Sequence, residues 1–593
     1  APATEESPEG NSSGEWEMVE DVNALLGEAH ELASKGNFPG AVQLYTKCIE
    51  HFPDNGDAWQ GRASCYLQGR FFHKAACDAD AALALDPPAE GSAFVAGMAR
   101  VGLQRYTEAA ALLAGVAEGD PSFAAATRAL EECRAMEAQA LRGEYDMGDI
   151  VLRGAKGKFD RCADYVGPLA VQLSAKAGRV LVTTEAVKQG QLLYVVRPQA
   201  IAPPGRGMLT HEEMARALCL AAERCPRERA ITYCLPDDSP GSEAKVPDAD
   251  VFRHHLPVPE GDIPPEEGAR EMYEHMQRVV GAKFRGSGRV GALFVLPCFI
   301  NHACAPTAAC VTMGTTMVGR AARDLAAGEE VSLAYYGVLV PRKERSAQSK
   351  KWGYSCRCAR CLCDGKGPVK EAFAKMEDKL GALSARVATG KDKKKGKKDK
   401  GVSAAEAGEA VASFEGELAA LGLEGQALQW CRAGAAGLYT VHLALLAAEG
   451  AHEEHARAYR SFLDAVEATE PLSMAHCKHA LAAHDAAAAA PAGTGAKASK
   501  KQRKGGDAEA APQEGASPAS VSRARIELVS ELLELDHRVV EPHLDSLWPQ
   551  AWACAGAGAG GAEVALIAGL VARLVRVYAE LRQLPPLLTS LLV

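Results

Sequence analysis

FVLPCFINHACAPTAAC, at residues 294–310, is the stretch that decides the fold. Two further stretches follow it in order: ARDLAAGEEVSLAYYG at residues 322–337 and WGYSCRCARCLCD at residues 352–364. Each stretch alone is a weak signal, because an Asn-His pair at a strand end usually forms a turn and a tyrosine in an apolar strand is usually core. Their occurrence together, in this order, is what makes them informative.

The segments around these motifs indicate short strands interrupted by a helical insertion. Residues 170–198 alternate, are rich in Val and Leu, and have turn signals at Ala177-Gly178 and Gln189-Gly190. A charged, helical pattern follows from Met208 to about Gly281. Strands are predicted again at 291–300, 307–318 and 330–336. By itself this pattern predicts an α+β fold and nothing more specific.

The motifs make the sequence similar to a known family. It resembles the SET-domain lysine methyltransferases, in particular the split type that includes the SET-and-MYND family and the tetratricopeptide-SET proteins. The matching elements are GRVL at Gly178–Leu181, INHACAP at Ile300–Pro306, GEEVSLAYY at Gly328–Tyr336 and CRCARC at Cys356–Cys361. The resemblance covers residues 165–363. Because the insertion contains no Cys-x-x-Cys pair, a MYND finger is not expected, and the tetratricopeptide-SET type is the better match.

This resemblance implies a protein-lysine N-methyltransferase that takes its methyl group from S-adenosylmethionine. Such a reaction needs a neutral amine aimed in line at the methyl group. The residues implied to contact the cofactor are Gly178, Arg179, Val180, Leu181, Asn301 and His302. Tyr335 matches the catalytic tyrosine, whose hydroxyl is mostly protonated at neutral pH if its pKa is near 10. Trp352 and Tyr354 match the aromatic walls of the lysine channel, which suit a cation.

Three positions depart from the family's pattern. Val180 replaces a glycine, Thr307 replaces an asparagine, and Ala282 replaces an asparagine two residues before Phe284. A β-branched side chain at 180 is expected to crowd a closely approaching cofactor. These departures motivate an alternative hypothesis, in which the protein is an interaction scaffold whose SET domain has lost catalysis.

The cysteine cluster predicts a structural zinc site in the post-SET loop. Cys356, Cys358 and Cys361 lie close enough in sequence for their thiolates to reach one ion at about 2.3 Å. A structural zinc ion needs four ligands. The family resemblance implies Cys304 as the fourth ligand, and Cys363 is the rival candidate. With four cysteine ligands no coordination position is left open for water.

The N-terminal third contains an internal repeat. Three kinds of residue recur with a spacing of 34: an aromatic residue, a small residue three positions later, and a proline twelve positions after that. They are Phe38, Phe72 and Tyr106; Ala41, Ala75 and Ala109; and Pro53, Pro87 and Pro121. This spacing resembles the tetratricopeptide repeat, a pair of antiparallel helices that stacks into an α-solenoid.

Such a solenoid predicts a protein or peptide partner on the repeats, in addition to a protein substrate that carries the target lysine. One known use of the fold is to clamp an acidic C-terminus with Lys, Asn and Arg side chains. This chain has Glu28 and Gly61 at the two Asn positions. A carboxylate clamp is therefore not expected here.

The predicted fold class is multidomain α+β: an N-terminal α-solenoid, a split SET β-fold with a helical insertion and a zinc-bound post-SET loop, and a C-terminal helical region. The predicted domains are a disordered tail at 1–20, repeats at 21–140, the SET domain at 165–340 with its insertion at about 205–285, the post-SET zinc loop at 341–365, a basic linker at 366–402, a helical region at 403–485, a low-complexity linker at 486–520 and C-terminal helices at 521–593.

Charge and hydropathy limit the partners and the compartment. The net charge of −10 argues against a general nucleic-acid-binding surface. The best apolar run, residues 564–581, is interrupted by charged side chains, so no association with a membrane is expected. Basic runs at 391–400 and 497–504 are candidate nuclear-localisation signals, although solvated charge in a linker is at least as good an explanation. The predicted location is the nucleus or the cytoplasm.

Overall fold

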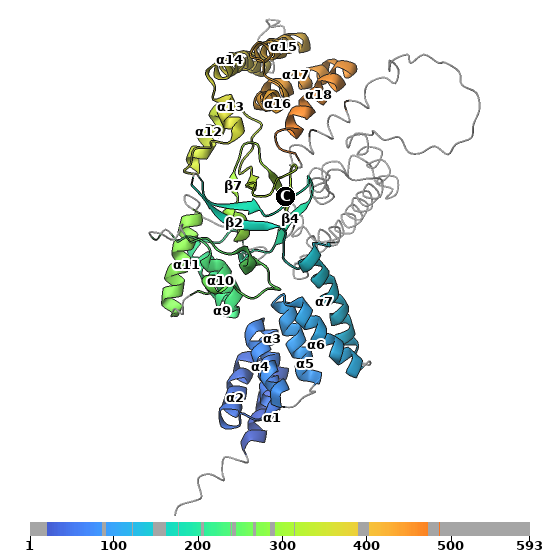
Figure 1. Cartoon of the computed structure of the whole chain (residues 1–593), viewed down its shortest axis with the longest axis vertical. Coiled ribbons are helices and arrows are strands. Elements are labelled where there is room, and N and C mark those ends of the chain that lie inside the picture. The colour runs from blue at the N-terminus through green and yellow to red at the C-terminus, as the bar shows by residue number, and fades with distance from the viewer. Residues whose placement is uncertain are drawn as a thin grey trace, which may run out of the picture. The chain divides into compact units, whose positions relative to one another are not determined.

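A computed structural model of the 593-residue chain describes part of it and divides into two compact units (Figure 1). The described residues are 21–85, 90–120, 123–145, 162–175, 177–202, 207–237, 239, 245–264, 268–284, 291–313, 315–389, 402–471, 479 and 486. Unit 1 comprises Ala1–Tyr145, Asp160–Val166 and Val195–Cys298. Unit 2 comprises Asp146–Phe159, Gly167–Tyr194 and Phe299–Val593. Each unit is described by itself below.

Unit 1 begins with a series of antiparallel helices, each packed against the next, shown in blue in Figure 1. They are α1 (Asp21–Ser34), α2 (Phe38–His51), α3 (Gly56–Gln68), α4 (Phe72–Leu85), α5 (Glu90–Gly102), α6 (Tyr106–Gly119) and α7 (Ala124–Arg142). The aromatic residues of the 34-residue period begin α2, α4 and α6, and the small residues Ala41, Ala75 and Ala109 are completely buried. The prediction of helical repeats resembling the tetratricopeptide type is therefore confirmed.

Local chemistry explains where these helices begin and how closely they pack. Asn37 and Asn55 cap α2 and α3, because their side-chain oxygens accept hydrogen bonds from the backbone N–H groups of Gly40 (3.2 Å) and Ala58 (2.9 Å). Gly61 lies against the ring of Tyr45, and a Cβ at position 61 would lie 2.5 Å from the Tyr45 Cζ atom. A glycine is thus required for the contact between α2 and α3.

The insertion also belongs to unit 1 and is helical. Its helices are α9 (His211–Arg224), α10 (Pro226–Tyr233), η2 (Ala249–Phe252), η3 (Glu260–Asp262) and α11 (Ala269–Lys283). Thr210 and Glu213 form a reciprocal capping box at the start of α9. Helix α9 packs against both α10 and α11. Short strands β1 (Tyr165–Val166), β5 (Ala200–Ile201) and β6 (Ala292–Leu293) complete the unit, with β5 and β6 antiparallel.

A buried carboxylate ties the repeats of unit 1 to the segments that flank the insertion. Asp164 accepts hydrogen bonds from the side chains of Gln104 (2.9 Å) and Arg197 (3.1 Å) and lies 3.4 Å from His254 Nε2. Burial alone would raise the pKa of Asp164, but Arg197, His254 and Gln104 more than offset this and lower it. Gln104 holds a left-handed backbone with φ of 60° at the turn between α5 and α6. The repeats and the insertion therefore share a polar core.

Unit 2 contains the strands that surround the motifs. Strands β2 (Leu169–Ser174) and β3 (Gly178–Thr183) are antiparallel, as are β8 (Ala308–Met313) and β9 (Thr316–Ala321), and β4 (Leu192–Val196) lies beside β9. Strands β7 (Asn301–His302) and β10 (Ser332–Leu333) are parallel. Three strand predictions need correction. Residues 330–336 contain only the two-residue strand β10. Residues 291–300 contain only β6 and the 3-10 helix η4 (Leu296–Phe299), since Pro297 lacks a backbone N–H for a ladder. Residues 307–318 are not one strand, because the chain turns back between β8 and β9.

Helices follow the strands of unit 2 (Figure 1). They are α12 (Arg342–Lys351), α13 (Ala359–Asp364), α14 (Gly367–Thr389), α15 (Ala404–Ala420), α16 (Gly425–Gly434), α17 (Ala436–Glu449) and α18 (His452–Glu467). The predicted basic linker at 366–402 is wrong for residues 367–389, which form α14. Its apolar residues Val369, Phe373 and Met376 recur at helical spacing and are buried in one core with Phe414 and Phe462.

Several predictions lie outside the described residues: the tail at 1–20, the lysine run at 391–400 and, apart from residue 486, the segments 486–520 and 521–593. Among the described helices, none alone has the length and apolar composition to cross a membrane. The strongly bent pair α16 and α17 meets that criterion only when the two helices are taken together.

Candidate functional site

The Asn-His pair lies at the centre of a knot of three chain segments in unit 2. Strand β7 pairs with β10, with Asn301 beside Ser332 and His302 beside Leu333. The Asn301 Nδ2 group donates to Glu330 Oε1 (3.2 Å) and lies 3.4 Å from the carbonyl oxygens of Ala177 and Arg179. Asn301 therefore connects the turn before β3 to the segment before β10.

Strand β3 joins the same knot through its backbone. The carbonyl oxygen of Leu181 accepts from the N–H of Val331 (2.8 Å), and the N–H of Thr183 donates to Glu329 (3.0 Å). Gly178 has a φ of 69°, a conformation that favours glycine, and it lies exposed at the start of the strand. The four residues Gly178–Leu181 thus form a fixed strand edge next to Asn301.

Tyr335 lies beside this knot and is held at both its backbone and its hydroxyl. Its hydroxyl donates to the carbonyl oxygen of Ile300 (2.5 Å), and its backbone N–H donates to His302 Nδ1 (3.1 Å). The side chain is 38% exposed. The neighbouring Tyr336 instead directs its hydroxyl to the carbonyl oxygen of Arg345 (3.2 Å). Of the two tyrosines, Tyr335 is thus the exposed one, and its hydroxyl bonds to Ile300, the residue before Asn301.

Aromatic rings gather around Tyr335. Its ring centre lies 5.6 Å from that of Trp352 and 6.3 Å from that of Tyr354, which meets it edge to face. Trp352 is 61% exposed, whereas Tyr354 is half-buried. Burial and the neighbouring Tyr336 hydroxyl raise the pKa of Tyr354 well above that of a free tyrosine. At neutral pH the cluster offers uncharged aromatic surfaces, which attract a cation.

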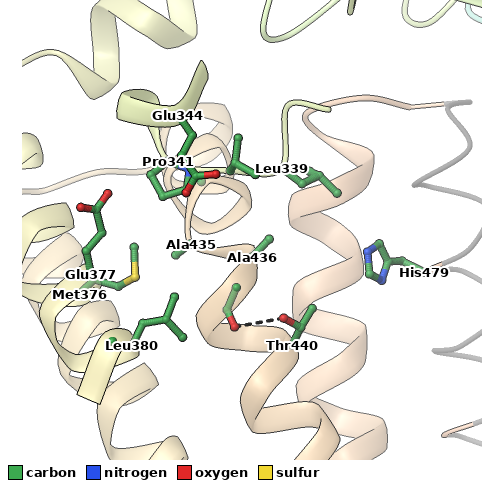
Figure 2. A pocket seen from close by; sticks show the side chains of 14 residues that line it. Leu339, Pro341, Glu344, Met376, Glu377, Leu380, Ala435, Ala436, Thr440 and His479 are labelled. Atoms are coloured by element: carbon green, nitrogen blue, oxygen red, sulfur yellow. Dashed lines mark hydrogen bonds between the residues drawn. The ribbon is translucent and has the colours of Figure 1, made fainter. Parts of the chain in front are cut away.

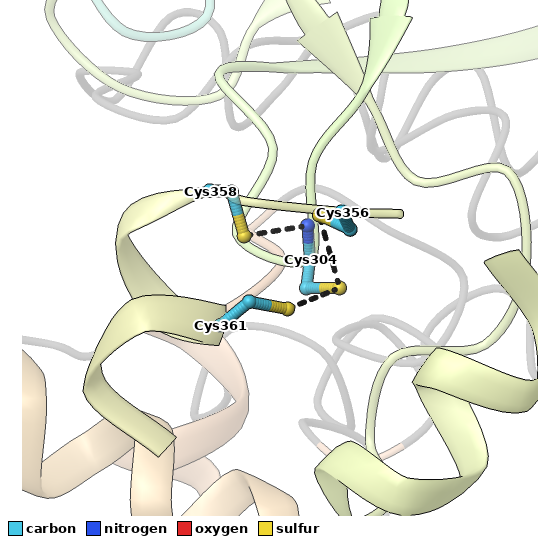
Figure 3. A group of neighbouring side chains, drawn as sticks. All are labelled: Cys304, Cys356, Cys358 and Cys361. Carbon is cyan, nitrogen blue, oxygen red and sulfur yellow. Dashed lines mark hydrogen bonds between the residues drawn. The ribbon is translucent and has the colours of Figure 1, made fainter. Parts of the chain in front are cut away.

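The four predicted ligand cysteines converge on one point (Figure 3). The Sγ atoms of Cys304, Cys356, Cys358 and Cys361 all lie within 4.8 Å of one another. Cys304 Sγ lies 3.9 Å from Cys356 Sγ and 3.5 Å from Cys361 Sγ. Four sulfurs placed tetrahedrally at about 2.3 Å from a zinc ion lie about 3.8 Å apart. The donor set and its spacing therefore fit a structural zinc ion.

Hydrogen bonding among these four thiols moves their pKa values in opposite directions. Hydrogen bonding from Cys304 lowers the pKa of Cys356 and lowers that of Cys358 to about 6. The same coupling raises the pKa values of Cys304 and Cys361. Thiolates rather than thiols bind metal. The rival ligand Cys363 is directed elsewhere, into a group with Asp364 and Cys431.

Part of this chain is similar to known proteins. Residues 178–336 match the family model described as SET domain. These residues are a SET domain. N-lysine methyltransferase SMYD2-B of Xenopus laevis is 33% identical over 88 residues, which are 15% of this chain and 20% of that protein. Histone-lysine N-methyltransferase ATXR2 of Arabidopsis thaliana is 28% identical over 122 residues, 20% of this chain and 25% of that protein.

The matched part of the SET domain is short. Histone-lysine N-methyltransferase SMYD3 of Mus musculus is 34% identical over 68 residues, 11% of this chain and 16% of that protein. The chain thus spans about a fifth of the length of the curated relatives that it matches. The solved Arabidopsis OM64 TPR domain is 25% identical over 20% of this chain and 96% of that chain, with a TM-score of 0.19. Because that score is low, the repeat assignment rests on the 34-residue spacing of the helices alone.

Two family departures are accommodated inside the SET domain fold. Val180 is buried, with 4% of its surface exposed, and its backbone pairs with Gln172 of β2. The Thr307 hydroxyl donates to the carbonyl oxygen of Glu330 (2.9 Å) and accepts from the N–H of Ser332 (2.8 Å). Ala282 lies in α11 of unit 1. Thr307 is therefore a structural part of the knot.

Sequence reasoning missed several charged residues that support the SET domain site. Arg345 and Asp364 form an ion pair with completely buried side chains, and Arg360 lies 3.8 Å from the same carboxylate. Arg360 also donates to the carbonyl oxygen of Cys304 (2.9 Å). The available signal was position, because Arg360 stands between the ligands Cys358 and Cys361 and Asp364 follows them. Glu330, which orients Asn301, was visible within the Gly-Glu-Glu motif.

A pocket of about 590 Å³ lies between the post-SET segment and the C-terminal helices (Figure 2). Glu344 and Glu377 line it together with apolar residues such as Met376 and Leu380. None of the predicted cofactor, channel or metal residues lines this pocket.

Proposed function

We propose that this protein is a protein-lysine N-methyltransferase that uses S-adenosylmethionine. The SET domain and the names of the matched relatives support the reaction class. The observation that carries the proposal is the placement of Tyr335, whose hydroxyl bonds to Ile300 immediately before Asn301 within an aromatic cluster. This arrangement suits a lysine amine that must be aimed and desolvated before it reacts.

In this proposal the SET domain residues bind and orient, and they perform little proton chemistry themselves. S-adenosylmethionine supplies an activated methyl group when it is bound. The edge formed by Gly178–Leu181 and the Asn301–His302 pair hold the cofactor, with Glu330 fixing the amide of Asn301. The Tyr335 hydroxyl donates to Ile300 and keeps its lone pairs for an approaching amine. Trp352 and Tyr354 present aromatic rings beside Tyr335 to the lysine side chain.

The cysteine cluster has a structural role in this proposal. Cys304, Cys356, Cys358 and Cys361 would hold one zinc ion and leave no position for water. Because Cys304 lies in the knot and the other three lie in the post-SET segment, the ion would join these two parts of unit 2. It would thereby keep Tyr354, two residues before Cys356, next to Tyr335.

The helical repeats are proposed to bind a protein or peptide partner, separate from the protein substrate. Stacked helix pairs of this type present an extended surface, which is their general use. A membrane or a specific nucleic acid is not expected as a partner, and the nucleus or the cytoplasm remains the predicted location.

The second candidate function is a scaffold with a catalytically inactive SET domain. The engagement of Thr307 favours it, because the three hydrogen-bond contacts of its hydroxyl, with the Glu330 carbonyl and with the N–H and hydroxyl of Ser332, are all made inside the knot. A cofactor contact made by the family's asparagine at this position would then be lost. Buried Val180 offers no compensating polar group.

Calorimetric titration with S-adenosylmethionine separates the two functions. The enzyme hypothesis predicts binding in the micromolar range, and no binding at high micromolar cofactor would refute it. A labelled-methyl assay then tests the catalytic residue: Tyr335→Phe should reduce transfer roughly a hundredfold or more. Tyr336→Phe is the matched control, because it removes a hydroxyl that bonds to Arg345, and it should reduce transfer far less. Equal losses would show that the wrong tyrosine was chosen.

A further inference from the structure

The imidazole of His302 lies between the cysteine cluster and Tyr335. Its Nδ1 atom accepts a hydrogen bond from the backbone N–H of Tyr335 at 3.1 Å. Its Nε2 atom lies 3.3 Å from Cys304 Sγ. One side chain therefore contacts both the proposed metal site and the backbone of the proposed catalytic residue.

The two contacts fix the tautomer of His302. A neutral imidazole carries a single hydrogen, on one nitrogen or the other. Because Nδ1 accepts from the Tyr335 N–H, the hydrogen belongs on Nε2 and points at Cys304 Sγ. A thiolate that is a metal ligand is a good acceptor for such an N–H donor, since the charge strengthens the bond.

The ring of His302 has little freedom to move. It stacks on Tyr336, with ring centres 4.4 Å apart and planes inclined by 29°. It also lies 5.4 Å from the ring of Tyr335 and 5.7 Å from that of Tyr354. The backbone of His302 is fixed by its pairing with Leu333 in β10. The imidazole is therefore held in one orientation between Cys304 and Tyr335.

We propose that His302 is a positioning residue that couples the cysteine metal site to Tyr335. Its Nε2–H orients the Cys304 thiolate, and its Nδ1 holds the Tyr335 backbone. Side chains that hydrogen-bond metal ligands typically change metal affinity about 10–100-fold when they are removed. The role of His302 toward the metal stands independently of the reaction, whereas its role toward Tyr335 rests on the proposed methyltransferase function.

Two substitutions separate the two contacts of His302. His302→Asn places an amide oxygen near the position of Nδ1 and keeps an acceptor for Tyr335, but it cannot reach Cys304. His302→Gln places an amide nitrogen near the position of Nε2 and keeps a donor to Cys304, but it loses the acceptor. His452→Asn is the matched control, because His452 is exposed on α18.

The readouts are zinc retention against a competing chelator, the charge-transfer spectrum of the cobalt-substituted protein, and kcat and KM with a lysine peptide. We expect His302→Asn to weaken zinc affinity about 10–100-fold. It should also shift the thiolate-to-cobalt charge-transfer band to longer wavelength, because loss of the N–H donor raises the energy of the sulfur orbitals that donate the electron. We expect His302→Gln to retain zinc and the band position, and to lower kcat more than it changes KM. The control should match the wild type.

Three outcomes would overturn the proposal. If both variants lose zinc and kcat to the same degree, His302 is only structural. If neither changes, the two contacts have no consequence. If the cobalt spectrum of the wild type shows three sulfurs and one nitrogen, and His302→Gln restores four sulfurs, His302 is a ligand. A wild type that binds zinc but transfers no methyl would refute the proposed function and leave the metal measurements as the test of His302.

Discussion

Asp364 balances two guanidinium groups at a site without access to water. The side chains of Arg345 and Asp364 are completely buried and form an ion pair, and Arg360, also buried, lies 3.8 Å from the same carboxylate. Arg360 in turn donates to the carbonyl oxygen of Cys304, a proposed zinc ligand. The substitution Asp364→Asn keeps the shape of the side chain and removes its charge.

The expected cost follows from the charges that remain. Removal of one partner of a buried ion pair typically costs about 3–5 kcal/mol, because the other charge is left uncompensated. Here two guanidinium groups lose their shared carboxylate, so we expect the upper part of that range. Since about 1.4 kcal/mol corresponds to a factor of ten, the opening equilibrium around α13 should rise on the order of a thousandfold.

Hydrogen exchange read by mass spectrometry measures this locally. The relevant amides are those of Leu362, Gly365 and Ala435, which donate to Cys358, Cys361 and Cys431. They should exchange much faster in Asp364→Asn. Glu406→Gln is the matched control, because it removes the charge of a pair with Arg386 in which the side chains are 39% and 48% exposed. Exposed pairs contribute only about 0.2–1 kcal/mol. If the two variants show equal changes, the buried cluster does not stabilise α13 and the reasoning is wrong.

Three further predictions concern metal binding, pH and packing. A colorimetric assay should find one zinc ion per chain in the wild type and none in Cys358→Ser. A wild type that is well folded and free of zinc would contradict the predicted site. Burial raises the pKa of Glu470 to about 7, and Arg360 only partly offsets this effect. The free energy of unfolding of the wild type should therefore fall, relative to that of Glu470→Gln, as the pH rises from about 4.3 to 7. Urea titrations in which the difference between the two proteins stays constant over this pH range would refute this. Gly61→Ala brings a Cβ to 2.5 Å from the Tyr45 ring and should lower the free energy of unfolding by about 1–3 kcal/mol, measured by thermal unfolding. Gly56→Ala is the control, because nothing lies within 4 Å of its Cβ, and it should not lower the stability in this way.

The parts of the fold that could be predicted are those encoded by spacing along the chain. The aromatic residues of the repeat begin α2, α4 and α6 because a period of 34 records the length of one helix pair. The spacing of Cys356, Cys358 and Cys361 was likewise informative, because ligands close in sequence need only a local turn to converge. Cys304 required the family resemblance, since its approach depends on the pairing of β7 with β10.

The parts that could not be predicted depend on where charges are placed in three dimensions. The sequence predicts a basic linker over α14 because the lysine run after this helix dominates the local composition, although the apolar residues of α14 follow a helical period. The position of Arg360 between Cys358 and Cys361 does not reveal its burial. Only the fold shows that it is fully buried and bonded to Cys304.

The three departures from the family pattern bear on contacts with the cofactor, and the structure shows which contacts Thr307 makes within the protein. Thr307 makes two hydrogen bonds that join the Glu330 carbonyl and the Ser332 N–H. Those bonds hold the segment whose carboxylate, on Glu330, orients Asn301. If the family's asparagine at this position contacts the cofactor, Thr307 gives up that contact but supports Asn301, which would make another. Affinity for the cofactor thus depends on Asn301 more than on Thr307. Glu330→Ala should therefore weaken the binding of S-adenosylmethionine more than Thr307→Ser, which keeps the hydroxyl. If a calorimetric titration gives the reverse order, this assignment is refuted.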